Sequence, residues 1–241
     1  MSESAYRPRD DEASPPLDHP PYRSTSLRHP VRPLVPLPHT ISEITGPGPA
    51  ISAVTPADAD LTTNAAVGGE AIGERILVTG RVLDETGEPV PDTLIEIWQA
   101  NAAGRYVHER DQHPAPLDPN FRGTGRCLTE ADGSYRFLTI RPGAYPWGNH
   151  PNAWRPAHIH LSLFGPALAT RLVTQMYFPD DPLHELDPIL GAVPRAHWDR
   201  LIATYDHDIT EHEWALGFRF EIVLRGPEAT PFESRGAGSP A

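Results

Sequence analysis

The sequence predicts an all-β protein, a β-sandwich with long proline-rich loops and a short helix or two. From Ile76 onward, short segments with alternating apolar residues recur between turns, and a period of two is typical of half-buried strands. The 241 residues include 29 prolines, against an average usage of about 5%. Because proline is excluded from helix interiors and central strands, this composition favours short strands with stiff connections over a helical fold.

Turn signals separate the expected strands. Asp132-Gly133 marks a tight hairpin, because this dipeptide suits the turns that join two antiparallel strands. We expect one short helix over residues 194–203. A second helical turn is expected to begin at Asp187-Pro188, where an N-cap residue precedes proline. Many short strands between turns are typical of a β-sandwich. We expect strands over residues 76–82, 93–98, 124–129, 134–140, 157–164, 171–178 and 218–224.

Composition along the chain divides it into three parts. Residues 1–20 are polar, proline-rich and without periodicity, so we expect a disordered or partner-bound arm. Residues 21–225 form the expected single domain. The N-terminal stretch 20–38, most of which belongs to this domain, contains prolines that exclude a helix. We predict that it is an extended segment packed on a surface. Residues 226–241 are rich in Gly, Pro and Ser, and we expect a mobile tail.

Charge and cysteine content narrow the class of protein. The formal net charge is -12, with no cluster of Lys or Arg, which argues against sequence-independent nucleic-acid binding. The N-terminus lacks the pattern of a signal peptide, and no apolar run approaches the roughly 20 residues that span a bilayer. Cys127 is the single cysteine, so we expect a cytoplasmic protein in a reducing compartment. We interpret Cys127 as a buried strand residue rather than a reactive thiol or metal ligand.

The segment around His158-Ile159-His160-Leu161 carries the strongest local chemical signal. Side chains alternate between the two faces of a strand, so His158 and His160 share one face while Ile159 and Leu161 belong to the core. Two neutral imidazoles at this spacing suit one metal ion. The alternative is a pair of ordinary hydrogen-bonded histidines, since an isolated His-x-His pattern is weak support for a metal site.

Zinc usually recruits Cys, His or a carboxylate, and ferrous oxygenases use two His and one carboxylate. No Asp or Glu follows His160 for many residues, and what stands upstream of the histidines is Tyr106 and Tyr145. The pKa of tyrosine is ordinarily near 10, but a trivalent cation favours the phenolate form. Two tyrosinates and one hydroxide would balance Fe(III), and a neutral cluster is less costly to bury than a bare cation. The alternative is that both tyrosines are packing residues in loops. We interpret His108 and His113 as solvated loop residues.

Five separated segments carry a further signal. Three of them are Asp132-Gly133-Ser134-Tyr135-Arg136-Phe137, Ile140-Arg141-Pro142-Gly143-Ala144-Tyr145-Pro146-Trp147 and Trp154-Arg155-Pro156-Ala157-His158-Ile159-His160. Together with residues 94–106 and 174–181 they resemble the signature of the intradiol ring-cleavage dioxygenase family, and the resemblance extends over about residues 22–225. Because the motifs occur in order, the resemblance is specific. It implies an iron-dependent β-sandwich enzyme that uses O2 to open an aromatic ring.

The resemblance also implies a role for each candidate iron ligand. Tyr145 and His160 would be the axial ligands, and Tyr106 and His158 the equatorial ligands, of one non-haem Fe(III) per chain. We read Tyr145 as the ligand that a catecholic substrate displaces.

Further residues receive roles from the same resemblance. Arg155, helped by Gln175, would stabilise negative charge on the substrate and its oxygenated intermediates. Trp147 and Ile189 would wall the pocket, and Tyr22 would reach the substrate from the N-terminal arm. An arginine beside a metal site also requires a partner for its charge, whereas Gln175, Trp147 and Ile189 could equally be packing residues.

Within the family, the proline-rich arm with Pro21-Tyr22-Arg23-Ser24 resembles the β subunits of protocatechuate 3,4-dioxygenases. That similarity implies cleavage of protocatechuate to 3-carboxy-cis,cis-muconate in aromatic catabolism, and a homologous α subunit as partner. We expect the partner to supply part of the receptor for the substrate carboxylate. Two alternatives stay open: a single-chain catechol or hydroxyquinol 1,2-dioxygenase, and a non-catalytic transthyretin-like β-sandwich binding module.

Overall fold

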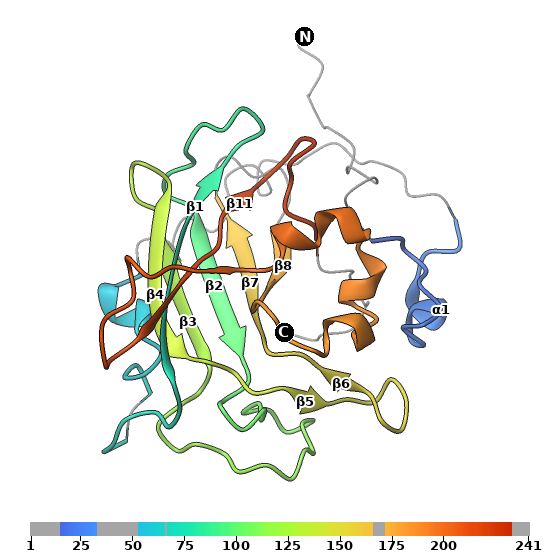
Figure 1. Cartoon of the computed structure of the whole chain (residues 1–241), viewed down its shortest axis with the longest axis horizontal. Coiled ribbons are helices and arrows are strands. Elements are labelled where there is room, and N and C mark those ends of the chain that lie inside the picture. The colour runs from blue at the N-terminus through green and yellow to red at the C-terminus, as the bar shows by residue number, and fades with distance from the viewer. Residues whose placement is uncertain (1–14, 33–52, 66, 166–171, 233–241) are drawn as a thin grey trace.

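The computed structural model describes residues 15–32, 53–65, 67–165 and 172–232. Two β-sheets pack against each other in these residues, and a short hairpin extends beside them (Figure 1). The all-β prediction is therefore confirmed. The first sheet contains β1 (Arg75–Leu83), β4 (Ser134–Ile140), β9 (Thr204–Tyr205), β10 (Leu216–Arg219) and β11 (Ile222–Val223), and the second contains β2 (Leu94–Gln99), β3 (Thr124–Leu128), β7 (His158–Phe164) and β8 (Leu172–Tyr177).

Strand pairing fixes which side chains meet. In the first sheet, β4 pairs antiparallel with one edge of β1, while β10 and β11 pair parallel with the other edge. In the second sheet the order is β3-β2-β7-β8, and every pair is antiparallel. The hairpin consists of β5 (Tyr145–Pro146) and β6 (Trp154–Arg155).

The core lies between the two sheets. Alternate residues of β7, Ile159, Leu161 and Leu163, are fully buried and pack with apolar side chains of β1 and β4, such as Val78 and Phe137. Apolar burial of this kind is the main stabilising contribution to a sandwich. The opposite face of β7 is buried as well, because the hairpin and the chain after β8 cover it. The histidines are on this covered outer face.

Short helical turns follow β8 and lie on its side of the sandwich (Figure 1). The expected helix over 194–203 is a 3-10 helix, η4 (Arg195–Arg200), and η2 (His184–Leu186) and η3 (Leu190–Ala192) precede it. Leu201 and Tyr177 share a backbone hydrogen bond, which attaches this segment to the free edge of β8. A further 3-10 turn, η1 (Pro56–Ala59), contacts β3 and β4. Within the described residues, no helix is long and apolar enough to cross a membrane.

The expected strand over 218–224 is two strands, β10 and β11, separated at Phe220. The carbonyl of Phe220 lies so close to Gly80 that a β-carbon at residue 80 would collide with it. Tyr135 Oη also donates a hydrogen bond to this carbonyl at 2.6 Å. The Phe220 carbonyl thus turns towards β1 and β4, and the ladder is interrupted there.

The N-terminal stretch contains one helical turn, so the prediction of a wholly extended segment was wrong. α1 (Thr25–Arg28) lies between the prolines at 20, 21 and 30, and Thr25 Oγ1 donates to the backbone carbonyls of His19 and Tyr22. Proline disrupts a helix interior but leaves room for a single turn between two prolines. Residues 1–14 of the expected arm and residues 33–38 lie outside the described residues.

The described part of the expected tail, residues 226–232, is packed on the domain. Thr230 is 3% exposed, its Oγ1 accepts a hydrogen bond from Val223 N, and the carbonyl of Pro231 accepts one from Thr174 Oγ1 at 2.8 Å. The packed chain therefore continues beyond Gly226. The rest of the expected tail lies outside the described residues.

Candidate metal centre

Sheet register places the two histidines among aromatic and polar neighbours. His160 lies between Trp98 of β2 and Gln175 of β8, and His158 lies opposite Tyr177. The His160 ring stacks on Trp98 with centroids 4.8 Å apart and planes inclined by 3°. Because alternate residues share a face, these five side chains form one polar patch on the outer face of the sheet. We call this patch, together with Tyr106, Tyr145 and Arg155 above it, the metal face.

The hairpin delivers Tyr145 to the metal face. Tyr145 in β5 pairs directly with Arg155 in β6, so one ladder position sets a phenol and a guanidinium side by side. Arg155 is followed by Pro156 and Ala157, and Ala157 N donates to Asp181 Oδ2 at 3.1 Å. This bond fixes the chain at the point where it enters β7.

The loop after β2 delivers Tyr106. Asn101 Oδ1 accepts hydrogen bonds from Ala103 N and Arg105 N, both at 2.9 Å, and Tyr106 N donates to Asp111 Oδ2 at 2.7 Å. Gly104 has a φ of +76°, and a β-carbon there would collide with the carbonyl of Ala144. This contact brings the Tyr106 loop against the residue that precedes Tyr145, and only glycine allows it without strain.

The four predicted ligands converge. Tyr145 Oη and His160 Nε2 each lie 3.2 Å from His158 Nε2. The rings of Tyr106 and Tyr145 meet edge to face with centroids 5.3 Å apart. The Tyr106 ring centroid lies 6.4 Å from that of His160.

The His158 tautomer is set by its own backbone. His158 Nδ1 lies 2.7 Å from the carbonyl oxygen of Pro156, which can only accept, so Nδ1 carries the proton. The lone pair of Nε2 therefore points towards Tyr145 and His160. Ligand histidines in metal sites commonly use the second ring nitrogen in this way.

Burial controls protonation at the metal face. Burial is the main cause that holds the pKa of His158 well below its usual value, and the neighbouring Arg155 and His160 act in the same direction. This imidazole is therefore neutral. Burial of the phenol raises the pKa of Tyr145, and the charge of Arg155 opposes this shift. In the absence of a cation both groups are therefore uncharged at neutral pH.

Arg155 is buried, with 3% of its residue surface exposed. Its Nη2 lies 2.6 Å from Gln175 Oε1 and 2.8 Å from Asp187 Oδ2, and its Nη1 lies 3.0 Å from His158 Nε2. Burial alone would lower the pKa of Arg155, but Asp187, Tyr177 and Tyr145 together more than reverse this and hold the pKa well above its usual value. Arg155 is therefore charged beside the histidines, as predicted, and Gln175 lies against it.

Sequence reasoning missed Asp187 and Tyr177. Asp187 was interpreted only as the start of a helical turn, and its Oδ1 does accept from Ile189 N at 3.0 Å. Its other oxygen supplies the partner that a buried Arg155 requires. Tyr177 Oη lies 2.8 Å from Arg155 Nη2 and donates to Gln175 Oε1 at 2.8 Å. The period-two pattern could have placed Tyr177 beside His158, but not next to Arg155.

Tyr22 reaches the edge of the metal face. Its ring centroid lies 5.2 Å from that of Trp147, and the Arg155 guanidinium lies over the Trp147 ring at 5.8 Å. Asn149, another residue that sequence reasoning missed, connects the two segments: its Oδ1 accepts from Arg23 N and its Nδ2 donates to the Pro21 carbonyl, both at 2.9 Å. The arm is thus attached to the β5–β6 loop.

The remaining candidates lie at different depths. Ile189 is buried and lines a small cavity with Gln175 and Tyr177. His108 is exposed, as expected. His113 is partly buried, and its ring packs edge-on against Trp154 at 6.1 Å, so the prediction of a solvated residue holds for His108 alone.

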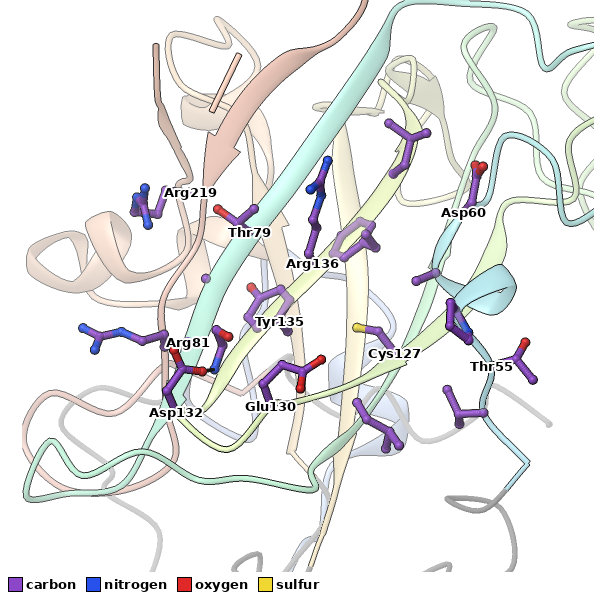
Figure 2. A pocket seen from close by; sticks show the side chains of 18 residues that line it. Thr55, Asp60, Thr79, Arg81, Cys127, Glu130, Asp132, Tyr135, Arg136 and Arg219 are labelled. Atoms are coloured by element: carbon purple, nitrogen blue, oxygen red, sulfur yellow. Dashed lines mark hydrogen bonds between the residues drawn. The ribbon is translucent and has the colours of Figure 1, made fainter. Parts of the chain in front are cut away.

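A large cavity lies away from the metal face. This groove of about 760 Å³ is formed by β1, β3, β4 and η1 and is lined by Arg81, Cys127, Arg136 and Arg219 (Figure 2). We call it the β1–β4 groove. Burial raises the pKa of Cys127 to about 12, so its thiol is unreactive at neutral pH. We place the chemistry at the metal face, because there the ionisable side chains contact one another.

The donor set fits a trivalent metal better than a zinc or calcium ion. No group of three or more His, Cys, Asp or Glu side chains in the described part of the chain could hold a metal, and Tyr106 and Tyr145 take the place of such ligands here. Two neutral imidazoles, two phenolates and one hydroxide would balance the charge of Fe(III). The lone pair of His158 Nε2 is oriented towards Tyr145 and His160.

Comparison with known proteins identifies the family. A family model described as "Dioxygenase" matches residues 45–226, and one described as "Protocatechuate 3,4-dioxygenase beta subunit N terminal" matches residues 7–40. The chain belongs to the intradiol ring-cleavage dioxygenases. Members of this family are oxidoreductases that use non-haem iron. The predicted family is confirmed, and the non-catalytic binding module is not supported.

Individual relatives agree with this assignment. The chain is 59% identical over 232 residues to the protocatechuate 3,4-dioxygenase beta chain of Burkholderia cepacia, covering 96% of this chain and 99% of that one. It is 30% identical to the alpha chain of the same organism over 67% of this chain and 78% of that chain. The hydroxyquinol 1,2-dioxygenase structure from Pseudomonas putida matches with a TM-score of 0.52 at 27% identity, covering 68% of this chain and 59% of that one.

Proposed function

We propose that this chain is the iron-bearing subunit of a protocatechuate 3,4-dioxygenase with one non-haem Fe(III) per chain. It would cleave protocatechuate between its two hydroxyl-bearing carbons, with both atoms of O2 incorporated, to give 3-carboxy-cis,cis-muconate. The observation that carries this proposal is the convergence of Tyr145, His158 and His160 at 3.2 Å beside Tyr106 in a chain so similar to a beta chain of that enzyme.

Tyr106, Tyr145, His158 and His160 would hold the iron. When bound, Fe(III) supplies a Lewis acid that keeps a catecholic substrate ionised and electron-rich. His158 contributes a neutral nitrogen whose orientation the Pro156 carbonyl fixes. The phenols contribute negative charge once a cation offsets the effect of burial on their pKa.

Tyr145 is suited to move a proton during substrate binding. A neutral catechol must lose protons to bind as a dianion, and Tyr145 Oη can take up one of them. Its ladder partner Arg155 holds positive charge beside the site at which the substrate becomes anionic. Replacing Tyr145 with Phe should therefore slow substrate binding while iron stays bound, and unchanged binding kinetics would count against this role.

Four further residues would position the substrate. Arg155 lies next to His158 and Gln175 lies opposite His160, and both can donate hydrogen bonds to oxygens that carry developing negative charge. Trp147 and Ile189 would form the walls of the pocket. Ile189 is buried and its backbone nitrogen donates to Asp187, while Trp147 lies under the Arg155 guanidinium; these contacts support this role.

Tyr22 would contact the substrate from the arm. Its hydroxyl accepts a hydrogen bond from Arg28 Nη2 at 2.5 Å. The Tyr22 ring packs on Trp147, which lies under the Arg155 guanidinium.

The proposed assembly contains a homologous α subunit. The similarity to alpha chains of Burkholderia cepacia and Pseudomonas putida supports it. A substrate carboxylate requires a cationic or hydrogen-bonding receptor, and Arg155 is already committed to Asp187 and Gln175. We expect the α subunit to supply part of this receptor. A fully active oligomer of this chain alone would contradict that expectation.

The first test is the visible absorption spectrum of the iron-loaded protein, expressed with its α partner. Charge transfer from tyrosinate to Fe(III) should give a broad red-brown band, and anaerobic addition of protocatechuate should shift it. A colourless protein that binds no iron after reconstitution would refute the proposal.

A single-chain catechol or hydroxyquinol 1,2-dioxygenase is the second candidate. The chain is 37% identical to a hydroxyquinol 1,2-dioxygenase of Rhizobium sp., but over 49% of this chain and 42% of that one. Steady-state rates on protocatechuate, catechol and hydroxyquinol separate the two. A preference for either substrate without a carboxylate would favour the second candidate.

A further inference from the structure

Asp187 contacts two predicted site residues, Arg155 and Ile189. Its side chain is fully buried, with 0% of its surface exposed. One carboxylate oxygen, Oδ2, lies 2.8 Å from Arg155 Nη2, and the other, Oδ1, accepts from Ile189 N at 3.0 Å. One residue therefore connects the buried cation to the backbone of a predicted pocket wall.

The contacts of Asp187 determine how Arg155 is turned. Nη2 lies 2.6 Å from Gln175 Oε1, 2.8 Å from Asp187 Oδ2 and 2.8 Å from Tyr177 Oη, and of these three only Asp187 carries a charge opposite to its own. The guanidinium group is planar and rigid, so fixing Nη2 also fixes Nη1. Nη1 then points towards His158, with 3.0 Å to its Nε2. Without the carboxylate, the positive charge would lose the partner that holds it in this plane.

The same contacts determine how Gln175 is turned. Arg155 has donors but no acceptor, so the amide atom that faces it must be the carbonyl oxygen. Tyr177 Oη donates to the same oxygen at 2.8 Å. The amide nitrogen therefore points the other way, and Gln175 Nε2 is buried without a hydrogen-bond partner among the described residues. A buried donor with no protein partner is available to a ligand.

We propose that Asp187 is a positioning residue for ring cleavage. It sets the plane of Arg155, and through Arg155 the orientation of Gln175, so that Arg155 Nη1 and Gln175 Nε2 both face the substrate. This inference rests on the proposed function, because it assigns Asp187 a part in the same reaction. Asp187 itself does not contact the substrate, so its effect must pass through Arg155.

A double-mutant cycle on the complex with the α partner tests this dependence. D187N keeps the size of the side chain and removes its charge. It should lower kcat by about 10- to 100-fold, the usual effect of losing a residue that orients a site, with KM changed less than about threefold. In an R155Q background the same substitution should change kcat by less than about twofold, because residues that act as a unit are not additive.

Two outcomes would overturn the proposal: full activity of D187N, or an equal loss of activity from D187N in both backgrounds. The matched control is D118N, which removes the charge of another buried aspartate. Asp118 accepts from the backbone nitrogens of Ile72 and Asn120 at 2.7 and 2.8 Å and lies outside the metal face. If D187N fails to fold, Y177F provides a parallel cycle, since it removes only a hydroxyl that contacts Asp187, Arg155 and Gln175. Its loss of activity must likewise disappear in R155Q.

Two measurements separate this inference from the proposed function. Wild-type activity on protocatechuate and the visible band test the function itself. A crystal structure of D187N tests the inference whatever that activity is: Arg155 should leave Gln175 and change its plane. An unchanged Arg155 in that structure would overturn the proposal even if the wild type cleaves protocatechuate.

Discussion

The metal face and the β1–β4 groove differ in how they hold their charges. The groove is large, and its arginines lie at the surface, where they pair with carboxylates; Arg136, for example, lies 3.1 Å from Glu211. At the metal face, the side chains of Arg155 and Asp187 are 3% and 0% exposed, and Tyr145 and His160 each lie 3.2 Å from His158 Nε2. The groove therefore contains solvent-exposed ion pairs, whereas the metal face contains a buried one.

The difference follows from desolvation. A charge in water is solvated at little cost, and surface ion pairs contribute about 0–1 kcal/mol. A buried ion pair costs several kcal/mol per ion to desolvate, which its own attraction only partly offsets. Folding would not favour such a cluster for stability alone, so its presence at the metal face indicates selection for chemistry. The β1–β4 groove shows no comparable cost.

The largest expected effect comes from removing a predicted ligand. His160→Ala deletes one imidazole that faces His158 Nε2 at 3.2 Å and leaves Trp98 without its stacking partner. We expect loss of the visible band and a fall in activity of more than about 100-fold, the upper range for residues that only orient ligands. Iron content and ring-cleavage rate measure the result.

Arg136→Ala is the matched change in the groove. It removes an exposed cation and its ion pair with Glu211, and we expect the band to persist and the rate to change less than about twofold, as for most surface substitutions. Equal effects of His160→Ala and Arg136→Ala would mean that the two regions do not differ in function as we infer.

A smaller effect is expected where the arm meets the metal face. Asn149→Ala removes two hydrogen bonds, to Arg23 N and the Pro21 carbonyl, each with a net contribution of about 1 kcal/mol. The arm should loosen and Tyr22 should lose its place on Trp147, so KM for protocatechuate should rise several-fold while kcat changes little. Steady-state kinetics decide this.

Asn120→Ala is the control for Asn149→Ala. Asn120 also connects loops, since its Oδ1 accepts from Val67 N at 3.1 Å, but it does so away from the metal face. We expect KM to be unchanged in this variant. A rise in KM for both variants would point to general loosening of the loops instead of an effect of the arm.

The sequence pattern was sufficient for most of the longer strands, and the family resemblance supplied the four candidate ligands. Alternation placed His158 and His160 on one face, and the structure brings Tyr106 and Tyr145 to them. The partner of Arg155 could not be predicted, because Asp187 is 32 residues away along the chain and belongs to a turn with no period of its own.

Two features of the fold were hidden for a similar reason. The interruption between β10 and β11 depends on the approach of Phe220 to Gly80, residues 140 positions apart in the sequence. The attachment of the arm depends on Asn149, whose partner Arg23 is 126 residues away. Local patterns describe alternation within a strand, whereas these features arise from contacts between distant segments.

The smallest effect on catalysis is expected from Cys127, which lines the β1–β4 groove yet is 5% exposed. Burial raises the pKa of its thiol from 9.0 to about 12, so the thiol is protonated in the folded protein at pH 8 and should react with thiol reagents only after unfolding. Because the folded pKa is the higher one, its contribution to stability is complete below pH 9 and decreases as the pH rises towards 12. Between pH 9 and 12 the free energy of unfolding of the wild type should fall more steeply than that of Cys127→Ala, by up to about 1.4 kcal/mol per pH unit. At pH 8 the visible band and kcat of the variant should equal those of the wild type. Rapid labelling of Cys127 in the native protein, or a lost band in the variant, would show that the groove holds reactive chemistry and would reverse the contrast with the metal face.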